Sequence, residues 1–319
     1  MKAIVQDHYG SADVLELQEI DTPVADDDGV LVRVEAASVN PLDWHIMRGS
    51  PFLVRMMSGL RQPKPRVRGV DVAGQIEAVG KNVTQFQPGD EVFGWCQGAF
   101  AEYVSAGEQN FLTRPGSLTH EQAAAVGVAG FTALQGLRDK GRIQPGHKVL
   151  VIGASGGVGT FAVQIAKSYG AEVTGVCRTA NTDMVRSIGA DHVIDYTRED
   201  FTQGHQRYDL IFQLAGTASP SRLRRVLTPK GTLVLSAGTG RLAGIDRVVR
   251  ALVVSPFVSQ RLVTWVASEN HEDLVTLKEL MESGKVTPVI DRSYPLHETP
   301  EAIRYVEDGH TRGKVVITM

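Results

Sequence analysis

The chain of 319 residues is long enough for about two domains, and its hydrophobic fraction of 42% and charged fraction of 22% are ordinary for a globular protein. Its formal net charge of −3 offers no general basic surface for nucleic acid and indicates no polybasic arm for membranes. Two cysteines, Cys96 and Cys177, are too few for a disulfide scaffold and suit a reducing compartment. Because the sequence shows no secretory leader and no uninterrupted apolar run of about 18 residues, we expect a cytoplasmic protein without a membrane span.

The first 121 residues contain short alternating or apolar runs, such as 30–36 and 70–80, separated by turn signals. This pattern predicts a compact, antiparallel, barrel-like domain. From about residue 121 helical and extended segments alternate, which predicts a parallel sheet with right-handed crossovers. The expected helices cover 121–138, 157–169, 181–188 and 219–227, and the expected strands cover 148–153, 172–177, 192–195, 208–214 and 231–236.

The tail returns to mixed structure, with helices expected at 271–283 and 298–307, an extended stretch at 289–291 and a last strand at 314–317. We expect this tail to fold back onto the first domain. The predicted fold is therefore α/β, with a barrel-like domain at 1–121 completed by 268–319 and a doubly wound parallel sheet at 122–267.

An apolar run at 149–152 breaks into a glycine-dense turn and then opens an amphipathic segment, which indicates a strand, a phosphate loop and a helix. Backbone N–H groups can meet a pyrophosphate only where side chains are missing, and a helix N-terminus adds positive charge there. The alternative is an ordinary glycine-rich turn. The residues predicted to bind a dinucleotide here are Ala154, Ser155, Gly156, Gly157, Val158 and Gly159.

The end of the next strand is the place where a dinucleotide fold reads the adenosine ribose, about 20 residues past the loop. Arg178 and Thr179 stand there instead of an acid, and a guanidinium suits the 2′-phosphate of NADP. The alternative interpretation is that Arg178 is merely a solvated surface residue. Asn181 adds a possible donor, and Tyr196 is expected beside the adenine end. NADP(H) is therefore the favoured cofactor.

Several motifs in a fixed order resemble the medium-chain dehydrogenase/reductase superfamily, and the likeness runs along nearly the whole chain. Within it, the segment Asn40-Pro41-Leu42-Asp43-Trp44 is most similar to the zinc-free, zeta-crystallin-like quinone oxidoreductases. The resemblance implies a GroES-like catalytic domain, a Rossmann domain and a nicotinamide cleft, with a homodimer as a family expectation. The motifs are Gly69–Gly74, Val79-Gly80, Pro88–Val92, Gly130–Ala133, Ala154–Gly159, Gly189–Asp191 and Gly309–Val316.

The nearest rival, the zinc alcohol dehydrogenases, needs three protein ligands for a catalytic zinc. By the resemblance, Asn40 stands at the first cysteine position and Val70 at the histidine position, and no cysteine lies near Ala129. The four closely spaced cysteines of the structural zinc lobe are also missing. We therefore predict a metal-free site.

Without a Lewis acid, hydride transfer from NADPH to a quinone or an α,β-unsaturated carbonyl is the expected chemistry, because the product anion delocalises charge. The resemblance places Asn40 at the cleft as a donor to the substrate oxygen, with a turn residue before Pro41 as the alternative. Asp43 either orients that loop or touches the cofactor ribose. His45 is either a proton relay or, as we favour, a solvated loop histidine.

An apolar substrate pocket is predicted from Phe52, Trp95 and Phe100, although core packing explains each of them equally well. Later strand ends at Ala215, Gly216, Ser236 and Gly238 add cofactor contacts, because open parallel sheets bind ligands there. Arg312 either approaches the cofactor phosphate or is a solvated basic residue. The remaining alternatives are an NAD(P)-dependent alcohol dehydrogenase or carbonyl reductase, and a structural or RNA-binding relative without activity; near-neutral charge argues against the RNA role.

Overall fold

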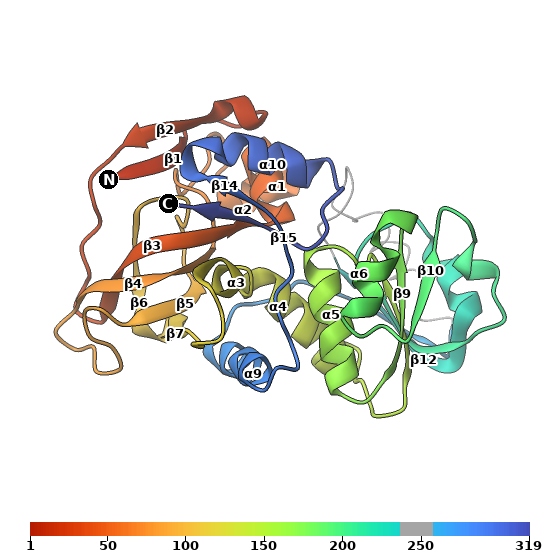
Figure 1. Cartoon of the computed structure of the whole chain (residues 1–319). Coiled ribbons are helices and arrows are strands. Elements are labelled where there is room, and N and C mark those ends of the chain that lie inside the picture. The colour runs from red at the N-terminus through yellow and green to blue at the C-terminus, as the bar shows by residue number, and fades with distance from the viewer. Residues whose placement is uncertain (237–257) are drawn as a thin grey trace. The chain divides into compact units, whose positions relative to one another are not determined.

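The computed structural model describes residues 1–236 and 258–319 (Figure 1). Its contacts divide the chain into two compact units, and each is described by itself below. The first unit contains residues 1–129, 269–282 and 288–319, and the second contains 130–268 and 283–287. The first boundary therefore lies eight residues beyond the sequence prediction, because the helical segment after residue 119 packs on strands of the first unit.

The first unit is built on a seven-stranded sheet with the order β14-β15-β3-β4-β5-β7, and β6 pairs with β3. The pairs are antiparallel as predicted, except that β14 and β15 run parallel. A separate antiparallel pair is formed by β1 (Lys2–Gln6) and β2 (Leu15–Glu19). The sheet strands are β3 (Gly29–Val39), β4 (Asp71–Val79), β5 (Glu91–Trp95), β6 (Tyr103–Gly107), β7 (Phe111–Thr113), β14 (Ile290–Pro295) and β15 (Lys314–Thr318).

Alternation along β3 explains how this sheet builds its core. Val30, Val32 and Val34 are buried, and the residues between them are partly exposed. Successive side chains of a strand point to opposite faces, so this pattern covers one face with apolar groups. Two short helices, α1 (Pro41–Arg48) and α2 (Phe52–Ser58), follow β3.

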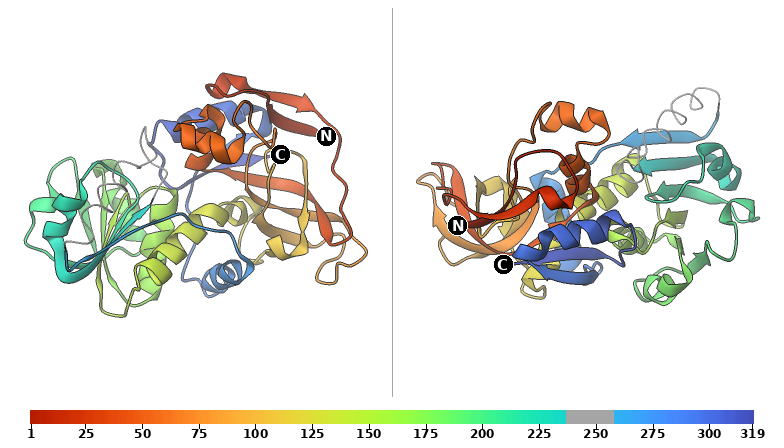
Figure 2. Two further views of the ribbon diagram at one scale, coloured as in Figure 1. Left: turned by 180° about the vertical axis from the view of Figure 1, so that it is seen from behind. Right: turned by 90° about the horizontal axis from the view of Figure 1, so that it is seen from above.

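Most of the tail belongs to the first unit, but Ser268 and residues 283–287, which were predicted there too, belong to the second. After α9 (His271–Glu282) and α10 (Thr299–Glu307), strand β15 pairs antiparallel with β3, with Val315 opposite Val39. The figures show this blue C-terminal strand beside the red and orange strands from the beginning of the chain (Figures 1 and 2). Residues almost 300 positions apart are thereby brought into one sheet.

The second unit contains a six-stranded parallel sheet in the order β10-β9-β8-β11-β12-β13. In chain order this is 3-2-1-4-5-6, the doubly wound arrangement that the sequence predicted. The sixth strand was not predicted, because its alternating Arg261-Leu262-Val263-Thr264-Trp265 carries less apolar character than the central strands. The strands are β8 (Lys148–Ile152), β9 (Glu172–Cys177), β10 (His192–Asp195), β11 (Tyr208–Gln213), β12 (Leu227–Ser236) and β13 (Arg261–Trp265).

Two predicted helices are shorter in the structure than in the sequence analysis. The segment 121–138 divides into α3 (His120–Ala124), α4 (Gly127–Gln135) and a π-helical turn, Gly136–Lys140. The segment 219–227 contains only α7 (Pro220–Leu223) and a 3₁₀ turn before β12 begins at Leu227. Within the described part of the sheet unit, α5 (Gly157–Ser168) and α6 (Thr182–Ser187) lie where helices were expected.

Candidate functional site

The loop between β8 and α5 has the shape that a phosphate group requires. Helix α5 begins at Gly157, and its N-cap Gly156 has extended backbone and no side chain to bond the first N–H groups. The N–H groups of the first helical turn have no intrahelical partner, so those of Gly157, Val158 and Gly159 are available to an anion. The loop therefore presents three donors and the positive end of a 12-residue helix.

Two glycines of this loop differ in the space that a side chain would find. A Cβ on Gly159 would lie 2.0 Å from the carbonyl oxygen of Gly153, so the loop itself could not close. A Cβ on Gly156 would meet nothing nearer than that oxygen at 3.6 Å, which leaves open space above the loop. This space is what a dinucleotide pyrophosphate would fill, so the residues present fit the cofactor that the fold implies.

Asn181 supports the same loop from the neighbouring strand end. Its side chain is buried, and its Nδ2 donates a hydrogen bond of 2.9 Å to Oγ of Ser155. Its Oδ1 is also buried and has no hydrogen-bond partner. An unsatisfied buried oxygen is costly, so a ligand donor at this loop would stabilise the arrangement.

Arg178 and Thr179 follow β9, as the sequence indicated. The guanidinium of Arg178 is partly exposed, whereas the hydroxyl of Thr179 donates to the carboxylate of Asp195. Tyr196, the next residue after β10, is 54% exposed and lines a shallow surface cavity together with Arg198 and Arg222. The predicted ribose and adenine residues thus come from the ends of two adjacent strands, β9 and β10.

The other predicted cofactor residues divide between the two units. Ala215 follows β11 and lies close to the glycine loop, since a Cβ on Gly153 would be 2.8 Å from the Cβ of Ala215. The next residue, Gly216, has a φ of +81°. Ser236 ends β12, whereas Gly238 lies outside the described residues. Arg312 belongs to the first unit, where its side chain is exposed and its N–H donates to Asp291.

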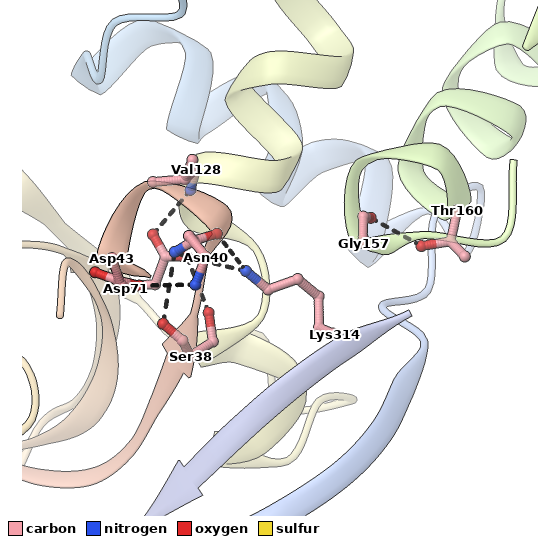
Figure 3. Close-up of polar contacts among 8 residues, drawn as sticks. All are labelled: Ser38, Asn40, Asp43, Asp71, Val128, Gly157, Thr160 and Lys314. Atoms are coloured by element: carbon pink, nitrogen blue, oxygen red, sulfur yellow. Dashed lines mark hydrogen bonds and ion pairs between the residues drawn. The ribbon is translucent and has the colours of Figure 1, made fainter. Parts of the chain in front are cut away.

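In the first unit, the carboxylate of Asp71 is the centre of a buried polar cluster (Figure 3). Its Oδ2 accepts hydrogen bonds from Ser38 at 2.9 Å and from Nδ2 of Asn40 at 2.8 Å. Its Oδ1 accepts from the backbone N–H of Val128 at 2.8 Å, at the start of α4. A Cβ on Gly127 would lie 2.0 Å from that oxygen, so the helix start can approach only because residue 127 is glycine.

Lys314 provides the positive charge of this cluster. Its Nζ donates to Oδ1 of Asn40 at 2.6 Å and lies 3.3 Å from Oδ2 of Asp71. The side chains of Lys314 and Asp71 are only 3% and 0% exposed. Burial lowers the pKa of Lys314, while the charge of Asp71 opposes this shift by favouring the ammonium form.

The amide of Asn40 is consequently engaged at both ends. Its oxygen accepts from Lys314, and its nitrogen donates to Asp71 and, at 3.5 Å, to the carbonyl of Ser38. Asn40 is also the N-cap of α1, with Pro41 in the first turn. Its assignment as a substrate donor stays a prediction, and the structure adds a positioning network that the sequence did not indicate.

Asp43 orients the start of α1, which is one of its two predicted roles. Its Oδ2 accepts a hydrogen bond of 2.7 Å from the backbone N–H of Asn40. Burial raises the pKa of Asp43 to about 7, with a further contribution from Asp71, and the bond from Asn40 partly opposes this shift. The carboxyl group therefore titrates near neutrality.

His45 is not the solvated loop histidine that we favoured. It lies within α1 and is 2% exposed, because its ring stacks on Trp44 with centroids 3.6 Å apart. Its Nδ1 lies 2.9 Å from the carbonyl oxygen of Ser50, to which it donates. The aromatic neighbour and the turn after α1 remove this side chain from solvent, and the relay role remains untested.

The three predicted pocket residues have different environments. Phe100 is completely buried in the main core cluster of the first unit, so it has the packing role given as its alternative. Trp95 is partly buried at the end of β5, whereas Phe52 is 65% exposed on α2. These three side chains therefore do not line one enclosed pocket within the described part of this unit.

Both thiols lie in surroundings that suppress their reactivity. Burial raises the pKa of Cys96 to about 12 and that of Cys177 to about 11. Since the thiolate is the nucleophile, neither cysteine contributes one at neutral pH. Among residues 1–236 and 258–319, no group of three or more His, Cys, Asp or Glu side chains is arranged to hold a metal ion.

Sequence reasoning missed Asp71, Lys314, Ser38 and Val128 as members of the cluster. Asp71 lies in the motif Gly69–Gly74, and Lys314 lies in the motif Gly309–Val316. Both motifs supported the family resemblance, but the sequence analysis assigned no role to their charged residues. The sequence did contain one signal for this cluster, a lysine immediately before the apolar run Val315-Val316-Ile317. A charged side chain at the start of a buried strand requires a partner.

A doubly wound sheet with a glycine loop at its first crossover, together with an antiparallel barrel-like unit, is the architecture of two-domain dehydrogenases and reductases. Residues 26–133 match the family described as alcohol dehydrogenase GroES-like domain, and residues 188–317 match the family described as zinc-binding dehydrogenase. The chain belongs to the medium-chain dehydrogenase/reductase superfamily, within its quinone oxidoreductase branch. It is an oxidoreductase.

Three similar proteins illustrate this relationship. The NAD(P)H oxidoreductase RTN4IP1, mitochondrial, of Mus musculus is 34% identical over 100% of this chain and 89% of its own length. The NADPH-dependent alkenal/one oxidoreductase, chloroplastic, of Arabidopsis thaliana is 32% identical over 99% of this chain and 79% of its own. The structure of the quinone oxidoreductase from Coxiella burnetii is 29% identical, with a TM-score of 0.88 and coverage of 100% and 99%.

Two expectations about cellular context have different outcomes. No helix within the described residues has both the length and the apolar character needed to cross a membrane. The two relatives are named for the mitochondrion and the chloroplast, so they lend no support to a cytoplasmic location. That location, like the homodimer and the lack of nucleic-acid binding, stays a prediction.

Proposed function

We propose that this protein is a zinc-independent, NADPH-dependent oxidoreductase that transfers hydride to a quinone or an α,β-unsaturated carbonyl. The observation that carries the proposal is the β8–α5 loop, whose open space above Gly156 and three available N–H groups fit a pyrophosphate. When bound, the cofactor supplies the hydride. The remaining work of this chain is to bind, to orient and to hold protons.

The preference for NADPH rests on Arg178. The first side chain after β9 is a partly exposed guanidinium, which suits a 2′-phosphate, whereas an acid would repel it. The nearby carboxylate of Asp195 already accepts from Thr179 and from Thr197. It is therefore less available to bind a free ribose hydroxyl. The name of the Arabidopsis relative, which includes NADPH, agrees with this choice.

The acceptor class rests on the absence of metal ligands at two positions and on the cluster around Asp71. Asn40 and Val70 offer no thiolate or imidazole, so we assign no Lewis acid to the reaction. An already polarised acceptor needs none, because its product anion is delocalised. The weaker donor contact of Asn40, 3.5 Å to Ser38, is the one that a substrate oxygen would replace.

Asp43 and Lys314 are the groups that we propose to hold or release a proton during the reaction. Both are buried within the same cluster, and the pKa of Asp43 is raised to about 7. A group that titrates near the working pH is suited to hold or release a proton. Asp43 bonds the backbone of Asn40 rather than a side chain, so its effect on chemistry would be exerted through that residue.

Steady-state oxidation of NADPH tests this proposal across 1,4-benzoquinone, naphthoquinones, 2-alkenals and simple ketones. We expect turnover with the first three classes and little with ketones. Turnover confined to ketones or alcohols would instead indicate a carbonyl reductase or alcohol dehydrogenase. Failure to bind either nicotinamide cofactor, together with an RNA gel shift at physiological salt, would indicate the non-catalytic alternative.

A further inference from the structure

Helix α2 of the first unit has its apolar side toward solvent. Phe52, Leu53 and Met56, which share one face of the helix, are 65%, 57% and 65% exposed, and Leu60 just beyond it is 62% exposed. A surface helix of a globular protein normally directs such residues into the core. In the described residues, ten large apolar side chains are exposed, and five of them lie within residues 42–60.

The opposite side of α2 explains why the helix keeps this orientation. The guanidinium of Arg55 lies over the ring of Tyr9 at 4.6 Å and donates to the carbonyl of Gly49 at 3.0 Å. Ser58 is buried and lies 3.0 Å from the hydroxyl of Tyr9, which also donates to the carbonyl of Gly59. Polar groups attach the helix to the body of the unit, so the apolar face is held outward.

The sequence segment that contains this face is basic. No acidic residue occurs between Asp43 and Asp71, whereas six basic residues do: Arg48, Arg55, Arg61, Lys64, Arg66 and Arg68. Arg48 is paired with Glu307 and Arg66 with Asp7. Arg61 and Lys64 are exposed, and neither forms an ion pair within the described residues. Two available cations therefore lie in sequence directly beyond the apolar face.

From this arrangement we propose that the face formed by Phe52, Leu53, Met56 and Leu60, with Arg61 and Lys64, docks on an anionic lipid surface. Outward apolar side chains insert at the boundary between headgroups and acyl chains, and neighbouring cations attract anionic lipids. An apolar partner protein would require no cluster of basic residues. The inference concerns binding to a surface and does not depend on the reaction.

This inference differs from the expectation drawn from net charge. The overall value of −3 averages over 319 residues and conceals a segment of 27 residues, 44–70, without a carboxylate. Electrostatic attraction to a membrane falls off within about 10 Å, so local charge decides binding. Apolar exposure alone would not have distinguished a lipid surface from a protein interface.

The test is flotation of the full chain with vesicles of phosphatidylcholine containing about a third phosphatidylglycerol, against vesicles of phosphatidylcholine alone. We expect binding to the anionic vesicles, weakened by added salt. The double variant Leu53→Ser with Met56→Ser should lose at least about tenfold in affinity. Replacement of Arg61 and Lys64 by serine should lower the affinity for anionic vesicles by about fivefold for each charge removed.

A matched control removes two exposed apolar side chains elsewhere, Val24→Ser with Val266→Ser, and should bind like the natural chain. Thermal unfolding establishes that every variant is folded. No binding to anionic vesicles, or equal binding by the α2 variant and the control, overturns the proposal. Loss of a dimer in the α2 variant, without vesicle binding by the natural chain, would also overturn it and would assign this face to a second copy. Since the assay needs no turnover, its failure is distinct from failure of the proposed reaction.

Discussion

The Nζ atom of Lys314 lies 2.6 Å from Oδ1 of Asn40, although the two residues are 274 positions apart (Figure 3). The contact forms because β15 pairs with the end of β3, which places the last strand beside the start of α1. It fixes the amide so that its nitrogen points to Asp71. The buried charge pair therefore determines the orientation of the residue for which we predict a substrate contact.

Replacement of Lys314 by methionine tests the strength of this cluster. The variant leaves the fully buried carboxylate of Asp71 without its cation, so we expect a loss of about 3–5 kcal/mol in the free energy of unfolding. Urea denaturation of the variant and the natural chain measures this difference in the free energy of unfolding. Lys285→Met, at an exposed lysine, should change stability by less than about 0.5 kcal/mol. A similar small effect at residue 314 would show that the pair contributes little.

Arg178→Ala should weaken NADPH binding by about ten- to a hundredfold, because a charged hydrogen bond contributes roughly 1.5–3 kcal/mol. NADH affinity should change little, since that cofactor lacks the phosphate. Fluorescence titration with both cofactors gives the comparison, with Arg225→Ala as an exposed arginine control in the same unit. Unchanged NADPH affinity would mean that Arg178 is only a solvated residue.

Two glycine variants separate folding of the loop from access to it. Gly159→Ala places a methyl group 2.0 Å from the carbonyl of Gly153, so we expect lower stability and lost cofactor binding. Gly156→Ala places its methyl group in open space, so we expect a folded protein whose NADPH affinity falls at least about tenfold. Thermal unfolding and cofactor titration measure the two effects. Normal affinity in Gly156→Ala would show that no cofactor approaches the loop there.

Asp43 should make stability depend on pH in an unusual direction. Its pKa in the folded protein is about 7, above the ordinary value of 3.8, so the folded state binds more protons between these values. Stability should therefore fall as pH rises from about 4 to 7, by at most about 1.4 kcal/mol per unit from this group. Asp43→Asn should flatten that part of the profile, measured by urea denaturation. An unchanged profile would show that Asp43 is ionised throughout.

Local signals were sufficient for most of the fold. The apolar run 149–152 followed by the glycine loop and an amphipathic segment predicted β8 and α5 correctly, because strand, turn and helix are each specified by neighbouring residues. The helix expected at 121–138 was wrong because apolar periodicity does not show where backbone hydrogen bonding changes register. The interruption follows Ala124, and a π-helical turn begins at Gly136.

The polar cluster of the first unit could be predicted only in part. Asn40 and Asp43 were found in one motif, since they are close in sequence. Asp71 and Lys314 are 243 positions apart, and no local pattern pairs them. His45 carried no signal for burial, because the stacking of Trp44 and the carbonyl of Ser50 exist only once the turn after α1 has formed.

Transfer of deuterium from NADPH labelled at the nicotinamide C4 position is the most direct test of the central claim. The measurement uses protein treated with a strong chelator and a 2-alkenal as acceptor, with the product analysed by NMR. We predict turnover after chelation, with the label on the β-carbon of a saturated aldehyde. Label on the carbinol carbon of an allylic alcohol, or turnover that requires added zinc, would contradict the account.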